Sequence, residues 1–138
     1  MANLLLVEDD TSLRQALTKA LSKAHYNCRG VGSLEEAIKA LLEESYDVVL
    51  LDLRLPDGER PQVVKKVKEV SEAKIIVITG YGDIKTAVES IKAGACDFIQ
   101  KPFNLDILEA SIKRAIKEKL TEEENLTLKE IIRKGIDY

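Results

Sequence analysis

The sequence has few residues that could build a metal–thiolate or disulfide site. The 138-residue chain contains two cysteines, Cys28 and Cys96, and a single histidine, His25. The cysteines form no CxxC pair, and with one histidine they cannot complete a usual zinc site. We therefore expect two reduced, partly buried thiols, and we assign no chemical role to His25.

The chain also lacks an excess of basic residues and any long apolar run. Its formal net charge of −3 argues against direct nucleic-acid binding, because phosphate contacts need a basic surface. No stretch is apolar and long enough to span a bilayer, and residues 1–9 lack the basic region and cleavage site of a signal peptide. We expect a cytoplasmic protein without membrane association.

What is present has the composition of one ordinary globular domain, with 45% hydrophobic and 33% charged residues. Short aliphatic runs predict buried strands at 4–7, 47–51, 74–78 and, more weakly, 96–99. A more polar run at 26–31 predicts an edge strand. Apolar residues at helical spacing predict helices over 13–21, 34–42, 63–70, 84–91 and 105–116.

Local signals support these boundaries: Ser33 with Glu36 predicts a capping box, Pro61 a helix start and Gly94 a helix end. The order β-α repeats five times, which predicts an α/β fold, a doubly wound (βα)5 three-layer sandwich around a parallel five-stranded sheet. We assign residues 1–118 to this domain and 119–138 to a helical tail or linker. The tail either extends the last helix or forms a new helix capped by Thr121 with Glu124.

Polar side chains follow four of the predicted strands at the point where each strand ends. They are Glu8, Asp9, Asp10, Asp52, Thr79 and Lys101. Because ligands of open parallel sheets bind at the carboxyl ends of the strands, we expect these side chains to lie close together. Crowded carboxylates repel each other unless a cation lies among them, and oxygen ligands suit Mg2+.

This set of groups suits phosphoryl transfer. A metal-bound Asp52 could attack phosphorus, while Thr79 and Lys101 could bind the phosphoryl oxygens. Each residue alone has a simpler explanation: Asp10 as a helix cap, Thr79 as a turn residue before Gly80, and Lys101 as a solvated loop residue. Four strand ends with complementary groups favour the functional interpretation.

Four motifs make the chain resemble the receiver domains of two-component response regulators. They are NLLLVEDD at 3–10, VVLLDLRLPDG at 48–58, IIVITGYGD at 75–83 and GACDFIQKPF at 94–103. The resemblance covers about residues 2–118 and implies a flavodoxin-like fold with strand order 2-1-3-4-5. It also implies a signalling switch that takes a phosphoryl group from a sensor histidine kinase.

The resemblance assigns a role to each strand-end residue. Asp52 is the phosphoacceptor and, with Asp9, a direct ligand of Mg2+ or Mn2+, while Glu8 acts through water. Thr79 is the switch hydroxyl, and Lys101 binds the phosphoryl group.

Further roles follow from the same resemblance. The backbone carbonyl of Arg54 is another metal ligand, and the side chains of Arg54 and Tyr81 tune the phosphoryl lifetime. Phe98 is the switch aromatic, although a lone aromatic in a strand usually belongs to the core. The Lys101–Pro102 bond is expected to be cis. Asp10 has at most a minor part in the site.

The segment from 79 to 128 is similar to NtrC-like, sigma-54-dependent activators. In those proteins a linker helix and a AAA+ ATPase follow the receiver, so such output domains are implied in a full-length protein. No G-x-x-x-x-G-K-[ST] loop occurs in this sequence, so this chain is not expected to hydrolyse ATP. We do not expect this chain to be an enzyme. We expect only self-phosphorylation from a phosphodonor and slow self-dephosphorylation.

A homodimer is also expected, through the face of the fourth helix, fifth strand and fifth helix or through the C-terminal helix. The candidate seam is Ile112, Ile116, Leu120, Leu128 and Ile131, interrupted by the acidic run 122–124. The sequence departs from similar receivers at Arg60 and Pro61, where a glycine and an apolar residue are usual. That difference concerns the loop after Asp52 and access of a kinase to it.

Three alternatives stay open. A haloacid-dehalogenase-type phosphatase uses similar groups, but its nucleophile lies on the first strand. A flavodoxin-like cofactor module needs a phosphate loop where this chain has acidic residues. A stand-alone, receiver-like interaction module would work without phosphorylation.

Overall fold

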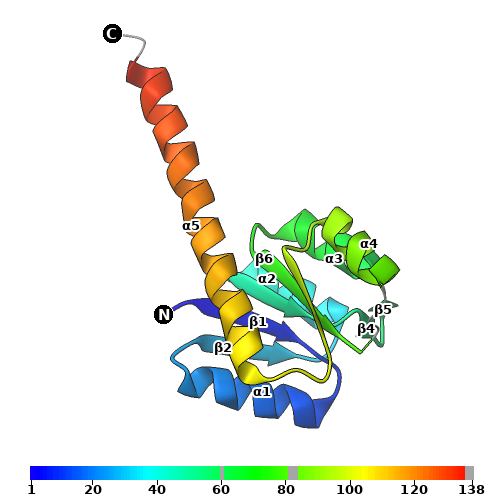
Figure 1. Cartoon of the computed structure of the whole chain (residues 1–138). Helices are drawn as coiled ribbons and strands as arrows, with labels where there is room; N and C mark the ends of the chain where they lie inside the picture. The colour runs from blue at the N-terminus through cyan, green and yellow to red at the C-terminus, as the bar shows by residue number, and fades with distance from the viewer. Residues whose placement is uncertain (60, 81–83, 136–138) are drawn as a thin grey trace.

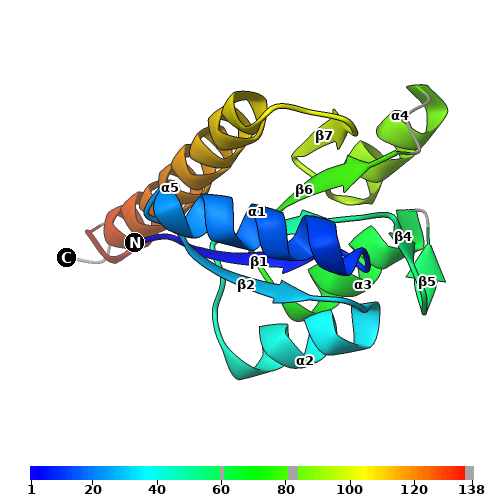
Figure 2. The ribbon, with the colours of Figure 1, turned by 90° about the horizontal axis from the view of Figure 1, so that it is seen from below.

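Five parallel strands form one central sheet, and helices cover both of its faces (Figures 1 and 2). The computed structural model describes residues 1–59, 61–80 and 84–135, with side chains described up to Glu123 except at Glu59. The sheet strands are β1 (Asn3–Val7), β2 (Asn27–Val31), β3 (Val48–Leu51), β6 (Lys74–Thr79) and β7 (Asp97–Gln100). Their order is β2-β1-β3-β6-β7, which confirms the predicted order 2-1-3-4-5.

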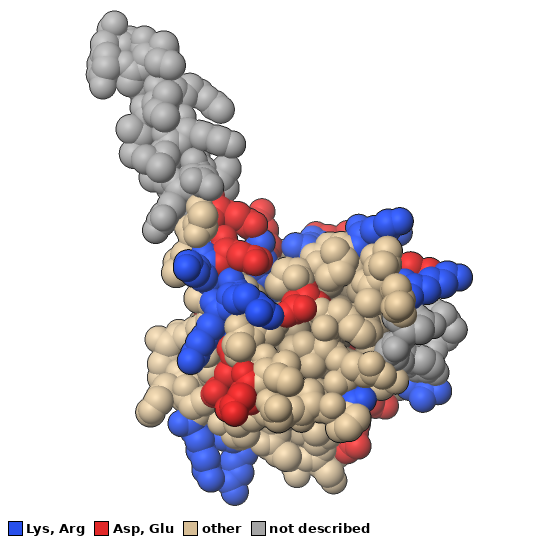
Figure 3. All heavy atoms as spheres, in the orientation of Figure 1, with Lys and Arg blue, Asp and Glu red and all other residues tan. Residues whose placement is uncertain are grey.

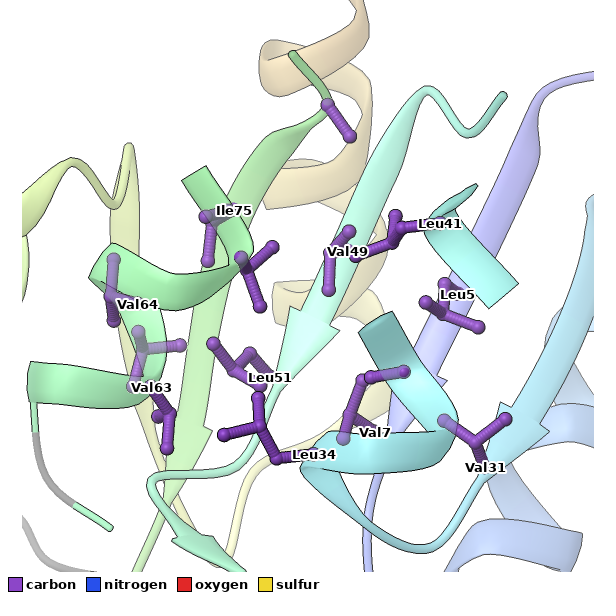
Figure 4. Packing of buried hydrophobic residues seen from close by; sticks show 14 of the residues in the cluster. Leu5, Val7, Val31, Leu34, Leu41, Val49, Leu51, Val63, Val64 and Ile75 are labelled. Atoms are coloured by element: carbon purple, nitrogen blue, oxygen red, sulfur yellow. The ribbon is translucent and has the colours of Figure 1, made fainter. Parts of the chain in front are cut away.

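Strand side chains alternate between two core clusters, one on each face of the sheet. In β1, Leu5 and Val7 enter the first cluster and Leu4 and Leu6 the second. Helices α2 (Leu34–Glu43) and α3 (Pro61–Val70) cover the first cluster, which Figure 4 shows from close by. Helices α1 (Thr11–Lys23) and α5 (Leu105–Gly135) cover the second. Each fully buried aliphatic side chain stabilises the fold by about 1.5–3 kcal/mol.

A short hairpin that the sequence did not predict follows β3. Its strands, β4 (Arg54–Leu55) and β5 (Gly58–Glu59), pair in antiparallel fashion around Pro56 and Asp57. The Asp57 carboxylate accepts hydrogen bonds from the backbone N–H groups of Leu34 (2.8 Å) and Glu35 (2.9 Å) at the start of α2. The hairpin thus fixes the loop after Asp52 to a neighbouring helix. Pro61 begins α3, as predicted, and Arg60 lies outside the described residues.

Helix α4 (Ile84–Ala93) lies beside α3 at the edge of the molecule (Figure 1). Its periodic apolar residues are exposed to solvent. Ile84 is 84% exposed, Val88 46% and Ile91 47%. Of the residues in α4, Ser90 is the buried one, and its hydroxyl donates to the backbone carbonyl of Thr86 at 2.8 Å. An apolar stripe that reads as a core face in the sequence is therefore a surface in this structure.

Helix α5 continues without a break from the domain into the tail and projects beyond the body (Figure 1). The Thr121 hydroxyl donates to the backbone carbonyl of Lys117 at 3.0 Å, so Thr121 lies inside the helix and caps no new one. Among the described residues, no helix is long and apolar enough to cross a membrane.

Candidate functional site

The carboxyl ends of four sheet strands meet around one acidic cleft of about 340 Å3. Its walls include all the predicted strand-end residues, listed here with their neighbours: Glu8, Asp9, Asp10, Asp52, Arg54, Thr79, Gly80 and Lys101. Glu8 is 1% exposed and Asp52 4%, and Thr79 is fully buried, whereas Asp9 and Asp10 are exposed. The parallel topology therefore assembles the site from segments that are far apart in the sequence.

Lys101 joins two of the carboxylates. Its Nζ lies 2.9 Å from Asp52 Oδ2 and also contacts Glu8 Oε1. The backbone N–H of Lys101 donates to the carbonyl of Thr79 at 2.9 Å, and the Lys101–Pro102 peptide bond is cis. The second oxygen of Asp52 accepts from the backbone N–H of Arg54 at 2.9 Å. Both oxygens of Asp52 are thus held in place.

Burial and crowding change the protonation of these groups. Burial raises the pKa of Glu8 to about 7, with a further increase from the nearby Asp52 and an opposing effect from Lys101. Burial by itself would lower the pKa of Lys101, but its hydrogen bonds to Glu8 and Asp52 raise it. The cleft therefore concentrates negative charge that one lysine only partly offsets.

The acidic side chains fit a hard divalent cation. Oxygen atoms of Glu8, Asp9 and Asp52 all lie within 4.8 Å of one another. Mg2+ takes one or two carboxylates together with water and phosphate oxygens, and this donor set consists of oxygen alone. The geometry of the described residues therefore supports the predicted metal position.

Other predicted residues have different places. Asp10 accepts from the backbone N–H of Leu13 at 3.1 Å and so caps α1, the simpler of its two explanations, while still lining the cleft. Phe98 lies on β7, half-buried, and packs against the first core cluster. Tyr81 lies outside the described residues.

The sequence did not single out Arg14, whose Nη1 donates to the backbone carbonyl of Glu8 at 2.8 Å. A usable signal existed: a basic residue follows the acidic run by one helical turn. Nor did the sequence predict an apolar groove of about 560 Å3 next to the acidic cleft. Its lining residues are Leu13, Ala16, Leu17, Ala20, Lys101, Pro102, Phe103 and Leu105. Lys101 lines both the apolar groove and the acidic cleft.

Sequence comparison places the chain in a known family. The family model of the response regulator receiver domain matches residues 4–113. The DNA-binding transcriptional regulator NtrC of Proteus hauseri is 36% identical over 115 residues, covering 83% of this chain and 24% of the relative. The C4-dicarboxylate transport regulator DctD of Pseudomonas aeruginosa is 33% identical over 126 residues, 91% of this chain and 27% of the relative. The chain thus spans about a quarter of the length of these relatives.

Solved receiver-domain structures have a similar fold. The beryllofluoride-activated NtrC4 receiver domain dimer has a TM-score of 0.80 at 36% identity, covering 86% of this chain and 98% of that one. A CheY-like receiver domain protein from Methanospirillum hungatei has a TM-score of 0.83 at 28% identity, covering 88% of this chain and 98% of that one.

The chain belongs to the response regulator receiver domain family of two-component systems. Within that family it is similar to the NtrC-like transcription regulators, which confirms the resemblance read from the four motifs. Its family differs from those of the phosphatase and the flavodoxin-type cofactor module.

Proposed function

We propose that this chain is a phosphoacceptor switch in which Asp52 receives a phosphoryl group. The observation that carries the proposal is the position of Asp52: the residue is 4% exposed, it lines the acidic cleft, and its carboxylate lies 2.9 Å from Lys101 Nζ. An Asp52 oxygen forms a bond to phosphorus while the bond from phosphorus to the donor's imidazole nitrogen breaks. The bonding electron pair stays on that nitrogen.

The residues around Asp52 suit the charge that this step moves. Lys101 can follow the transferred group, because its ammonium already contacts one carboxylate oxygen of Asp52. The Thr79 hydroxyl, at the end of the neighbouring strand, can donate to another phosphoryl oxygen. Mg2+ held by Asp9 and Asp52, with Glu8 behind, would offset the negative charge of the carboxylates and phosphoryl oxygens.

We infer that the phosphodonor is a sensor histidine kinase. The apolar groove between α1 and the segment after β7 supports this partner, because it shares Lys101 with the acidic cleft. A partner resting on Leu13, Ala16 and Phe103 would therefore hold its phosphohistidine near Asp52. Such a donor would act in the cytoplasm.

We infer that the output is transcription regulation through domains beyond this chain. The NtrC-like relatives are roughly three and a half times as long as this chain, which supports a AAA+ ATPase and a DNA-binding domain in a full-length protein. The exposed apolar residues of α4 support a homodimer through the α4–β7–α5 face. We propose no enzymatic turnover beyond self-phosphorylation and slow self-dephosphorylation.

Intact-mass measurement with acetyl phosphate tests this function. The native protein should gain one phosphoryl group in Mg2+, and Asp52→Asn should gain none because an amide oxygen is a poor nucleophile. Asp10→Asn is the matched control: it removes a carboxylate from the same cleft and keeps a good helix cap, so it should still be phosphorylated. Prior addition of a chelator should prevent the gain.

Failure of the native protein to gain mass would reject the switch and leave a receiver-like module that works without phosphorylation. Steady release of p-nitrophenol from p-nitrophenyl phosphate would instead indicate a phosphatase.

A further inference from the structure

The backbone of Glu8 in the acidic cleft is held on both sides. Its N–H donates to the carbonyl of Val31 on β2 at 3.0 Å. Its carbonyl accepts from Arg14 Nη1 at 2.8 Å. The Glu8 side chain, in turn, contacts Lys101. The three consecutive acidic residues 8–10 therefore begin from a fixed backbone position even though their charges repel each other.

Two glycines leave room for the Arg14 side chain. Gly30 lies on β2, paired with Leu6 of β1, and a Cβ there would come within 2.9 Å of Arg14 Cγ. A Cβ on Gly32 would come within 2.8 Å of Arg14 Nη1. Neither glycine has a positive φ, so the backbone itself would accept alanine. What the absent Cβ atoms provide is room for the arginine, and at Gly30 also for the Thr18 hydroxyl.

We propose that Arg14 is a positioning residue of the cation site: it holds the acidic loop after β1 in the geometry that a divalent cation requires, and Gly30 and Gly32 are small so that it can do so. The inference rests on the proposed Mg2+ site. Mg2+ demands near-ideal octahedral geometry, so a shift of the backbone between Glu8 and Asp9 weakens its binding.

Replacing Arg14 would change Mg2+ affinity in two opposite ways, one through its charge and one through its hydrogen bond. The two effects can therefore be measured separately. Loss of a positive charge near the cleft would by itself favour binding of a cation. Loss of the hydrogen bond to Glu8 would disfavour it. Gly32→Ala displaces the guanidinium and keeps its charge, so that variant isolates position.

The test is a Mg2+ titration followed by NMR on isotopically labelled protein, with no phosphodonor present. Gly32→Ala should weaken Mg2+ binding by about tenfold, the range seen when outer-shell partners are lost. Arg14→Met should also weaken it. In the Arg14→Met background, Gly32→Ala should change the affinity by less than about twofold, because the group it displaces is already gone.

Lys19→Met is the control, since it removes a positive charge from an exposed position of the same helix. It should not weaken binding. Native Mg2+ affinity in Gly32→Ala would overturn the proposal, and so would an equal loss from Gly32→Ala with and without Arg14. In either case the Asp52 switch would stand.

Hydrogen exchange of the Glu8 amide in metal-free protein provides a second readout. It should become faster in Gly32→Ala and Arg14→Met, but stay unchanged in Lys19→Met. If the native protein bound no Mg2+, the proposed metal site would fail. The exchange rates would still decide whether Arg14 holds the loop, because unchanged rates in Gly32→Ala would reject that role.

Discussion

At the residue scale, one ammonium group of Lys101 contacts two buried carboxylates and partly offsets their charge. Lys101 contacts Glu8 and lies 2.9 Å from Asp52, while 22% of its own side chain stays exposed. Removing one partner of such a group leaves the others buried without compensation. Lys101 therefore contributes to stability as well as to the proposed chemistry.

We expect Lys101→Met to lower the free energy of unfolding by about 1–3 kcal/mol, less than a fully buried pair would lose. Urea unfolding in Mg2+-free buffer measures the change. Lys113→Met, at an exposed position of α5, should stay within about 0.5 kcal/mol of the native protein. Native stability in Lys101→Met would show that the contact contributes nothing.

The two thiols give a prediction about pH. Burial raises the pKa of Cys28 to about 11, from an ordinary value of 9.0. The unfolded chain ionises first, so this group makes the fold less stable as pH rises between those two values. Iodoacetamide at pH 8 should label Cys28 about a hundredfold more slowly in the folded protein than in urea. Peptide mass spectrometry measures the labelling of Cys28. Equal labelling rates in the folded protein and in urea would contradict the prediction.

Residue-scale prediction from sequence succeeded where side chains define the site and failed where backbone atoms do. The positions of Asp52, Thr79 and Lys101 at strand ends can be predicted because each follows the end of an apolar run. Arg14 binds a carbonyl, and Asp57 binds two backbone N–H groups. The sequence places Arg14 one helical turn after the acidic run, but it does not indicate which carbonyl Arg14 binds or which N–H groups Asp57 binds, because backbone partners carry no residue-type signature.

At the element scale, α5 is clamped to the body at the point where it leaves the domain. Lys74, at the start of β6, pairs with Glu122, and Lys119 pairs with Asp47 at 3.3 Å. Figure 3 shows acidic and basic side chains side by side at this base of the helix. Asp47 also accepts from the backbone N–H of Asn3 at 2.7 Å, which ties the clamp to β1.

Breaking one pair of the clamp should loosen this turn of α5. An ion pair at the surface is worth about 0.2–1 kcal/mol, so Glu122→Lys should speed hydrogen exchange of amides 119–123 by up to about fivefold. Adding Lys74→Glu to the same protein restores opposite charges and should restore slow exchange. Exchange that stayed fast in the swapped protein would mean that the pair does not hold the helix.

Long periodic elements were predictable, and short ones were not. The aliphatic runs of β1, β3 and β6 predicted central strands, and polar β2 predicted an edge. The β4–β5 hairpin has two residues per strand, too few for any period to show. For the tail, periodicity could not distinguish one long helix from two, because either would place apolar residues at the same spacing.

At the scale of the whole molecule, the exposed face of α4 is the surface best suited to self-association. Ile84, Val88 and Ile91 expose apolar area that a dimer would bury. Periodicity revealed that these residues form a stripe, but it could not reveal that the stripe lies outside the core.

We expect Val88→Asp to leave stability within about 0.5 kcal/mol of the native protein and to abolish association of the phosphorylated form. Light scattering before and after acetyl phosphate treatment measures the oligomer. Leu42→Asp, at an exposed apolar position of α2, should not affect association. If Val88→Asp and Leu42→Asp associated equally, the dimer contact would not lie on α4.

The ion pairs of the cleft join residues that are remote along the chain: Lys101 is 49 residues from Asp52 and 93 from Glu8. The Glu8 pair joins the segments that follow β1 and β7, and the Asp52 pair joins those that follow β3 and β7. Closing such long loops costs chain entropy before the contacts form, which slows folding. A chain that ends before Lys101 therefore lacks the lysine of the proposed acceptor site, and phosphorylation of Asp52 would report that β1, β3 and β7 have all joined the sheet.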